Sequence, residues 1–140
     1  MEVLGVAASI VGILAAAGKI CEILVPIASA LGDKHNAKAI WSEVDSARMI
    51  LLSLQQLINN LETVYLDHAD MVQVSNLRAT LNEGNSLFSE VESLVSQLGT
   101  AEDRRSQMRW ARQSGKVVSL ISRMQGFKLT ISVMLSILQW

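Results

Sequence analysis

The stretch that decides the fold is residues 40–58, IWSEVDSARMILLSLQQLI. Its apolar residues recur at alternating steps of four and three, and the series continues beyond the stretch. The complete stripe is Ile40, Val44, Ala47, Leu51, Leu54, Ile58, Leu61 and Tyr65. This spacing is typical of helices that pack nearly parallel or antiparallel in a bundle. It predicts one long helix with a single buried stripe.

Three further segments repeat this pattern. Their stripes are Val3, Val6, Ile10, Ile13, Ala17, Ile20, Leu24, Ile27 and Leu31; Val74, Leu77, Leu81, Gly84, Phe88, Val91, Val95 and Leu98; and Val117, Leu120, Met124, Phe127, Ile131, Met134 and Leu138. No stretch shows sustained strand alternation, and no Asn-Gly or Asp-Gly dipeptide marks a hairpin. A chain of 140 residues is about one domain long. We therefore expect an all-α, up-and-down helical bundle of four long helices plus one short helix, forming a single domain over residues 1–140.

Polar and glycine-containing segments predict where the helices end. They place helices near residues 3–31, 35–66, 71–98, 102–113 and 116–139. Asp70 and Gln73 have the spacing of a capping box ahead of the third long helix. Gly99 stands where a helix-ending glycine is expected. Ser114 and Gly115 are expected to break or bend the chain before the last helix.

The residue types needed for enzymatic chemistry do not form a convincing arrangement. Cys21, the single cysteine, lies in an apolar run, so we expect a buried structural thiol in a reducing compartment. Asp67, His68 and Asp70 come nearest to a metal cluster, but the two aspartates are better suited to capping helices. No Ser–His–Asp arrangement and no phosphate-binding glycine loop is present. We expect no enzymatic activity, no catalytic residue, no cofactor and no metal.

The net charge of −1 conceals an uneven distribution. Residues 1–103 hold five basic and all thirteen acidic residues, a charge of −8, whereas residues 104–140 hold seven basic residues, a charge of +7. The seven are Arg104, Arg105, Arg109, Arg112, Lys116, Arg123 and Lys128. This segment can meet anionic lipid, nucleic acid, or acids of the same bundle such as Glu90 and Glu92. Nucleic acid is disfavoured as the principal partner, because the segment also carries core-spaced Leu, Ile and Met.

The chain opens MEVLGVAASIVGILAAAG, and no charged side chain occurs from Val3 to Gly18. A signal peptide would need a positively charged start, which is lacking here. A permanent transmembrane helix needs about 20 apolar residues, slightly more than this run provides. Two interpretations remain open: a helix buried permanently in the core, and a helix that is buried at rest and inserted into a membrane later.

Small residues occupy a second face of this opening helix. They are Gly5, Ala8, Ser9, Gly12 and Ala16. Such small-xxx-small spacings let helix backbones approach closely. Each glycine costs about 1 kcal/mol of helix stability against alanine. We therefore expect tight helix–helix contact at this face, either inside the fold or between copies in an oligomer.

Three segments resemble the fungal N-terminal domain of STAND, or NOD-like, receptors, called the HeLo-like domain. The opening MEVLGVAASIVGILAAAGKICEIL is similar to that family's acid followed by a Gly/Ala-rich helix that reaches a lysine. The segment WSEVDSARMILLSLQQLI looks like its second helix. The ending MRWARQSGKVVSLISRMQGFKLTISVMLSILQ resembles its Trp, basic residues and Leu/Ile ladder, and the resemblance covers essentially the whole chain.

The resemblance implies a cytoplasmic bundle ahead of a nucleotide-binding oligomerisation module and a repeat sensor. In this family clustering is thought to carry the first helix to the plasma membrane, in programmed cell death, heterokaryon incompatibility and innate immunity. Gly5, Ala8, Gly12 and Ala16 would then form a glycine-zipper-like face, with Ser9 beside it. Glu2 and Glu22 would be candidate pore-lining acids.

The partners follow from the same resemblance. Self-association on activation and an anionic membrane are expected. Candidate lipid contacts are Arg104, Arg105, Arg109, Arg112 and Lys116. The alternative is a homotypic interaction or scaffold domain that transmits oligomerisation without inserting a helix. A third candidate is a small helical regulator that binds nucleic acid or acidic partners through residues 104–128.

Overall fold

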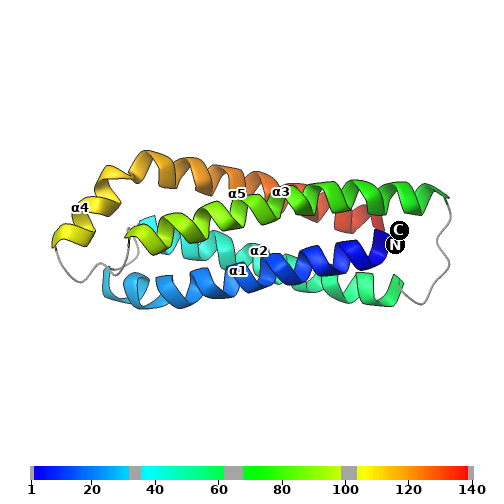
Figure 1. The fold of residues 1–140 in the computed structure, drawn as a ribbon, viewed down its shortest axis with the longest axis horizontal. Helices are drawn as coiled ribbons and strands as arrows, with labels where there is room; N and C mark the ends of the chain where they lie inside the picture. The colour runs from blue at the N-terminus through cyan, green and yellow to red at the C-terminus, as the bar shows by residue number, and fades with distance from the viewer. Residues whose placement is uncertain (1, 32–35, 62–67, 99–103, 139–140) are drawn as a thin grey trace.

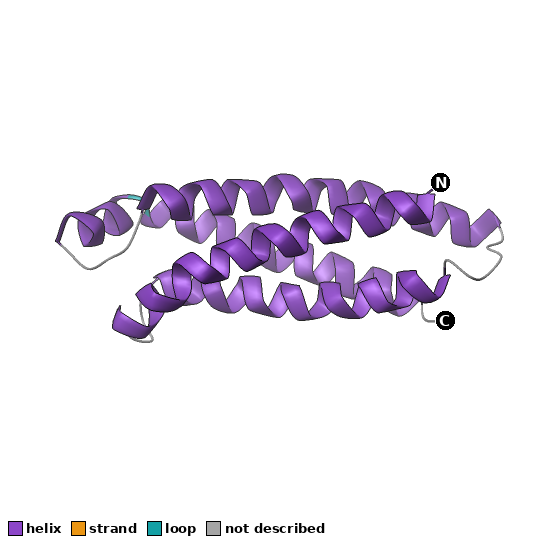
Figure 2. Cartoon of the chain, turned by 60° about the horizontal axis from the view of Figure 1, so that its bottom comes forward, coloured by secondary structure: helices purple, strands orange, loops and turns teal. Residues whose placement is uncertain are grey.

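A computed structural model describes residues 2–31, 36–61, 68–98 and 104–138, and their side chains over residues 5–26, 36–60, 73–98 and 108–138. The helices are α1 (Glu2–Leu31), α2 (Asn36–Leu61), α3 (His68–Leu98), α4 (Arg104–Arg112) and α5 (Ser114–Leu138). Within this described part of the chain there is no strand. The predicted all-α bundle of four long helices and one short helix is confirmed (Figures 1 and 2).

The predicted helix boundaries differ from the observed ones mainly at the start of α3. This helix begins at His68, three residues before the predicted start, so Asp70 lies inside it and the predicted capping box at Asp70 is wrong. A carboxylate in the first turn is favourable beside the unsatisfied N–H groups there, so helix and acid are compatible. Gly99 and the predicted end of the second helix at residue 66 lie outside the described residues.

The chain bends between α4 and α5 at Gln113 rather than at Ser114 and Gly115, which already belong to α5. Two backbone hydrogen bonds continue through the bend. The N–H of Gln113 donates to the Arg109 carbonyl at 3.1 Å, and the N–H of Val117 donates to the Gln113 carbonyl at 2.9 Å. Helical hydrogen bonding therefore runs almost without a break from α4 into α5, and α4 projects at one end of the bundle (Figure 1).

Successive long helices run in opposite directions, as an up-and-down bundle requires (Figure 1). Their packing, however, does not follow chain order. Helix α1 packs against α2 and α3, and α5 packs against the same two helices. Hence α1 and α5 occupy opposite corners of the bundle, and so do α2 and α3. As a consequence α1 and α3 are parallel neighbours.

The core consists of the predicted stripes. Every stripe residue whose side chain is described is buried, except Met134 and Leu138, which are partly buried. Gly84 belongs to this core, because a Cβ placed on it would overlap the ring of Phe127 and lie 3.2 Å from Ile13 Cδ1. Phe127 meets Phe88 edge to face, with ring centroids 5.8 Å apart. Gly84 thus lets α1, α3 and α5 meet at one level.

Candidate functional site

Helix α1 presents two different faces to its surroundings. Its inner face is closed, with Val6, Ile10, Ile13, Ala17 and Ile20 all 0% exposed. Its outer face follows a second stripe at steps of three and four, which is Ala8, Val11, Ala15, Gly18, Glu22 and Val25. Val11 is 56% exposed, and no charged side chain lies on the outer stripe before Glu22. The helix is therefore apolar on the side that faces solvent as well as on the side that faces the core.

Composition alone would allow this helix to cross a membrane. The segment Gly5–Pro26 has a mean hydropathy of 1.9, and 33% of its most apolar window is buried in the bundle. An apolar helix in a soluble domain is ordinarily buried on most of its surface. Most of this window instead faces solvent or is only partly covered, and that combination singles out α1 as a candidate functional element.

The polar edge of α1 lies along α3. The Ser9 hydroxyl donates to Asn82 Oδ1 at 3.2 Å, and Asn85 Nδ2 donates to the Ser9 carbonyl at 3.3 Å. A Cβ on Gly12 would lie 3.0 Å from Asn85 Oδ1, and one on Gly5 would lie 3.0 Å from the Arg78 guanidinium. The side chains of α3 thus lie directly over the α1 glycines. We call this row of contacts the α1–α3 seam.

The structure divides the predicted set of small residues. Gly5, Ser9 and Gly12 lie at the α1–α3 seam, so their close helix–helix contact is found inside the fold. Ala8 is exposed on the outer face, and Ala16 is partly buried against the core. The five residues therefore do not form one free surface in this state of the molecule.

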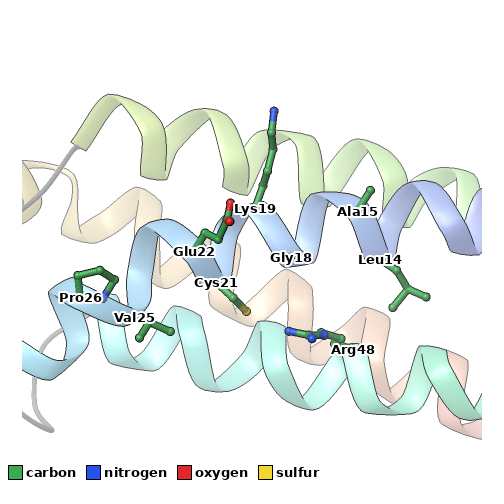
Figure 3. A pocket seen from close by; sticks show the side chains of 9 residues that line it. All are labelled: Leu14, Ala15, Gly18, Lys19, Cys21, Glu22, Val25, Pro26 and Arg48. Atoms are coloured by element: carbon green, nitrogen blue, oxygen red, sulfur yellow. The ribbon is translucent and has the colours of Figure 1, made fainter.

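The two candidate acids lie at different places. Glu2 is the first residue of α1, and its side chain lies outside the described part. Glu22 is exposed and lies beside Lys19 (Figure 3). Lys19 pairs with Glu92 of α3, with Nζ 3.5 Å from Oε1. This exposed pair contributes little stability, because solvent screens it.

An open hollow of about 720 Å³ lies between α1 and α2. Its walls include Leu14, Val25 and Pro26 of α1 and Arg48 of α2, and the sulfur of Cys21 points toward α2 (Figure 3). Burial raises the pKa of the Cys21 thiol, and the neighbouring Arg48 guanidinium offsets only part of that effect. Cys21 is a buried structural thiol, as its apolar sequence context predicts.

The basic segment 104–128 divides into an exposed end and a part that pairs with acids of the neighbouring helices. Arg109, Arg112 and Lys116 are exposed at the α4 end, while the side chains of Arg104 and Arg105 lie outside the described part. Trp110 anchors α4 to the core and is 1% exposed. A positive cluster therefore projects from the end of the bundle opposite the two chain termini (Figure 1).

The remaining basic residues of this segment bind acids of the bundle. Arg123 Nη2 lies 2.7 Å from Glu90 Oε2, as the sequence analysis allowed, and Lys128 Nζ lies 2.9 Å from Glu43 Oε2. Arg123 therefore holds the pKa of Glu90 below its ordinary value. Glu92, the other candidate partner, pairs with Lys19 instead. These links tie α5 to both of its neighbours.

The outer faces of the other long helices differ sharply. On α3 no large apolar side chain is exposed among the described residues; Ser86, Ser93 and Gln97 are typical of its outer side. On α5, by contrast, Leu129 is 67%, Val133 52% and Ile137 47% exposed. Exposed apolar surface therefore concentrates on particular helices, which is a common sign of an interaction surface.

The residues nearest to a metal cluster in the sequence lie largely outside the described side chains. Asp67 lies outside the described residues, and the side chains of His68 and Asp70 are not described. Among the side chains that are described, no group of three metal-ligating residues comes together. Among the described residues, the apolar surfaces and the basic end are therefore the candidate functional surfaces.

No family model, curated protein or solved structure matches the chain. The resemblance to the HeLo-like domain therefore rests on the sequence segments quoted above.

Three features of the site were not predicted from the sequence. The first is that Arg78 and Asn85 cover the α1 glycines, which no periodic signal indicates because both lie outside the apolar stripe. The second is the exposed ridge on α5, although the absence of charged residues after Lys128 was a signal that could have revealed it. The third is the position of α5 diagonally opposite α1, which depends on the tertiary packing order.

Proposed function

We propose that this bundle is an N-terminal signalling and cell-death execution domain of a fungal NOD-like receptor. In this proposal the domain is cytoplasmic at rest, clusters when its receptor is activated, and then targets or permeabilises the plasma membrane through α1. The observation that carries it is the apolar outer face of α1, which is uncharged from Val3 to Gly18 even where it meets solvent.

The physical basis is a helix with two competing environments. In the bundle, the inner face of α1 is buried while Ala8, Val11 and Ala15 remain in water. In a bilayer, both faces would leave water, and the backbone polar groups would stay satisfied within the helix. Clustering can shift this balance because it provides new partners for the released helix and for the bundle left behind.

The basic end supplies a second attraction to membranes. Arg112 and Lys116 are exposed, and each basic residue near an anionic leaflet adds about 1 kcal/mol of attraction. Anionic lipid is favoured over nucleic acid as the partner, because the exposed apolar surface of α1 has no use in binding a phosphate backbone. Binding should weaken as salt concentration rises.

The alternative function is a homotypic interaction or scaffold domain in which α1 stays in place. Two observations favour it: the inner face of α1 is completely closed, and the seam holds Ser9 through both Asn82 and Asn85. Both functions need self-association, so release of α1 into lipid is the step that separates them.

The experiment is dye release from vesicles that contain anionic lipid, with neutral vesicles in parallel. Deleting residues 1–18 would remove Ile10 and Ile13 from the core, so substitutions on the outer face are cleaner. In Val11→Glu/Ala15→Glu two charges face solvent in the bundle but would enter lipid on insertion. We expect dye release to fall about tenfold or more, with circular dichroism unchanged.

The matched control is Ser86→Glu/Ser93→Glu, which adds the same charges to the exposed face of α3. It should release dye like the unmodified chain. Equal release by both double variants would refute insertion of α1. Absence of release by a folded unmodified chain, even when clustered by a fused oligomeriser, would favour the scaffold function. Equal binding to neutral vesicles would remove the role of the basic end.

A further inference from the structure

We propose that the exposed ridge of α5 in one copy docks on the outer face of α1 in a second copy. The ridge consists of Leu129, Val133 and Ile137, and the receiving surface consists of Ala8, Val11 and Ala15. This inference deepens the clustering step of the proposed function by naming the two surfaces that meet. It applies while α1 is still in the bundle.

The two faces are complementary in shape. The α5 ridge is built from large side chains, each about half exposed or more. On the α1 surface Ala8 and Ala15 flank Val11, its one larger side chain, and Gly18 adjoins it, so its relief is low. A helix face with projecting side chains packed on a face with small side chains buries more apolar area than two faces of the same kind packed on each other. The two faces therefore fit each other better than either fits itself.

The two faces are also uncharged. Residues 3–18 of α1 and residues 129–138 of α5 contain no charged side chain. The nearest charge on α5, that of Lys128, is turned toward Glu43 and Ser46 of α2. A contact between these faces therefore buries no ion, and it avoids the desolvation penalty that opposes burial of charges.

The two faces also lie at matching positions in the bundle. Helices α1 and α5 stand at opposite corners of the bundle, so one copy cannot join its own two faces. Both faces lie in the half of the bundle that carries the two chain ends, and the helices run in opposite directions (Figure 1). Copies of the same polarity, side by side, thus bring α1 of one against α5 of the next at the same level.

Such a contact joins two different surfaces and leaves one of each free at the ends. A contact of this heterologous kind continues into a ring or an open chain rather than stopping at a dimer. In either assembly every copy points the same way, and the N-terminal ends of all α1 helices gather on one side.

The test is sedimentation velocity of the 140-residue chain across a wide range of concentrations. We expect the unmodified chain to grow beyond a dimer as concentration rises. Val11→Glu and Leu129→Glu should each stay monomeric, because each loses one of the two faces. Their equimolar mixture should form a dimer and stop there, since the intact α5 of the first variant meets the intact α1 of the second.

Met49→Glu is the matched control, because Met49 of α2 is 65% exposed against 67% for Leu129 but lies outside both faces. It should associate like the unmodified chain, and circular dichroism should match for all variants. The inference is overturned if the unmodified chain stays monomeric at every concentration, if Leu129→Glu still associates, or if the mixture stays monomeric. Association of Leu129→Glu but not of Val11→Glu would indicate an α1–α1 contact instead.

Dye release separates failure of this inference from failure of the proposed function. If the unmodified chain releases dye while the mixture stays monomeric, the α1–α5 contact falls and the membrane function stands. If the mixture dimerises while the unmodified chain releases no dye even when clustered, the contact stands and serves the scaffold function.

Discussion

Helices α1 and α3 are parallel neighbours with equally closed inner faces, yet their outer faces are opposites. Ile13 of α1 and Leu81 of α3 are both fully buried. Outside, α1 presents Val11 to water, whereas α3 presents residues such as Ser86 and Ser93. Packing within the bundle explains why both inner faces are apolar. Contact with water explains the polar outer face of α3, but it does not explain the apolar outer face of α1. The outer face of α1 is therefore a candidate surface for binding a partner.

The largest expected effect tests whether the two inner faces are equivalent. Ile13→Ala and Leu81→Ala should each lower the free energy of unfolding by about 2–5 kcal/mol, because each removes fully buried methyl groups and leaves a cavity. Urea denaturation followed by circular dichroism measures both, and Val11→Ala on the outer face should change the value by less than about 0.5 kcal/mol. A loss below about 1 kcal/mol for Ile13→Ala alone would show that α1 is only loosely held.

A smaller effect tests the seam that joins the two helices. Asn85→Ala should cost about 0.5–1.5 kcal/mol, because the Asn85 amide donates to the Ser9 carbonyl at 3.3 Å and the Leu81 carbonyl at 3.4 Å. Gly12→Ala should be nearly neutral in the unmodified chain, where the added Cβ crowds Asn85 Oδ1. In the Asn85→Ala background it should stabilise the helix by about 1 kcal/mol.

Gly18→Ala is the control for this cycle, because nothing lies within 4 Å of a Cβ at Gly18. It should stabilise the protein by about 1 kcal/mol in both backgrounds. If Gly12→Ala behaves like Gly18→Ala throughout, the seam does not constrain α1. A Gly12→Leu substitution would press on Asn85 and disturb the seam. Substitutions on the outer face of α1 therefore test the membrane function without this side effect.

The contrast also shows which parts of the fold can be predicted from sequence. Buried stripes are periodic, and solvent exclusion acts on each helix separately, so residues such as Leu51 and Phe88 were placed in the core correctly. The predicted cap at Asp70 failed because a carboxylate is compatible with a helix start and with a position inside the first turn. Local sequence patterns therefore predict where helices lie better than they predict where helices begin and end.

Packing order and outer faces were harder to predict. Nothing in the apolar spacing of α2 and α3 indicates that these consecutive helices lie at opposite corners. The sequence predicts a close approach at Gly5 and Gly12 either inside the fold or between copies in an oligomer, because glycine spacing does not identify the partner helix. Only the positions of Arg78 and Asn85 show that the partner is α3.

The smallest expected effect concerns the polar interactions that join neighbouring helices. The hydrogen bonds that Ser9 makes with Asn82 and Asn85 in the α1–α3 seam join neutral groups, whereas α5 is tied to α2 by the ion pair of Lys128 with Glu43. Burial alone would raise the pKa of Glu43. The hydrogen bonds from Lys128 and Gln125, together with the Lys128 charge, outweigh burial and hold that pKa below its ordinary value of 4.5.

A carboxylate with a lowered pKa in the folded state stabilises the fold above its unfolded pKa, and this contribution is lost as pH falls through the folded pKa. Urea denaturation from pH 7 to about pH 3 should therefore show a smaller acid-induced loss for Glu43→Gln than for the unmodified chain, by up to about 1 kcal/mol. The cost of Asn85→Ala should be the same at both ends of this range, because no group in its hydrogen bonds titrates. An unchanged acid response in Glu43→Gln, or a pH-dependent cost of Asn85→Ala, would contradict this division between an ion pair on α5 and the neutral hydrogen bonds of Ser9 on α1.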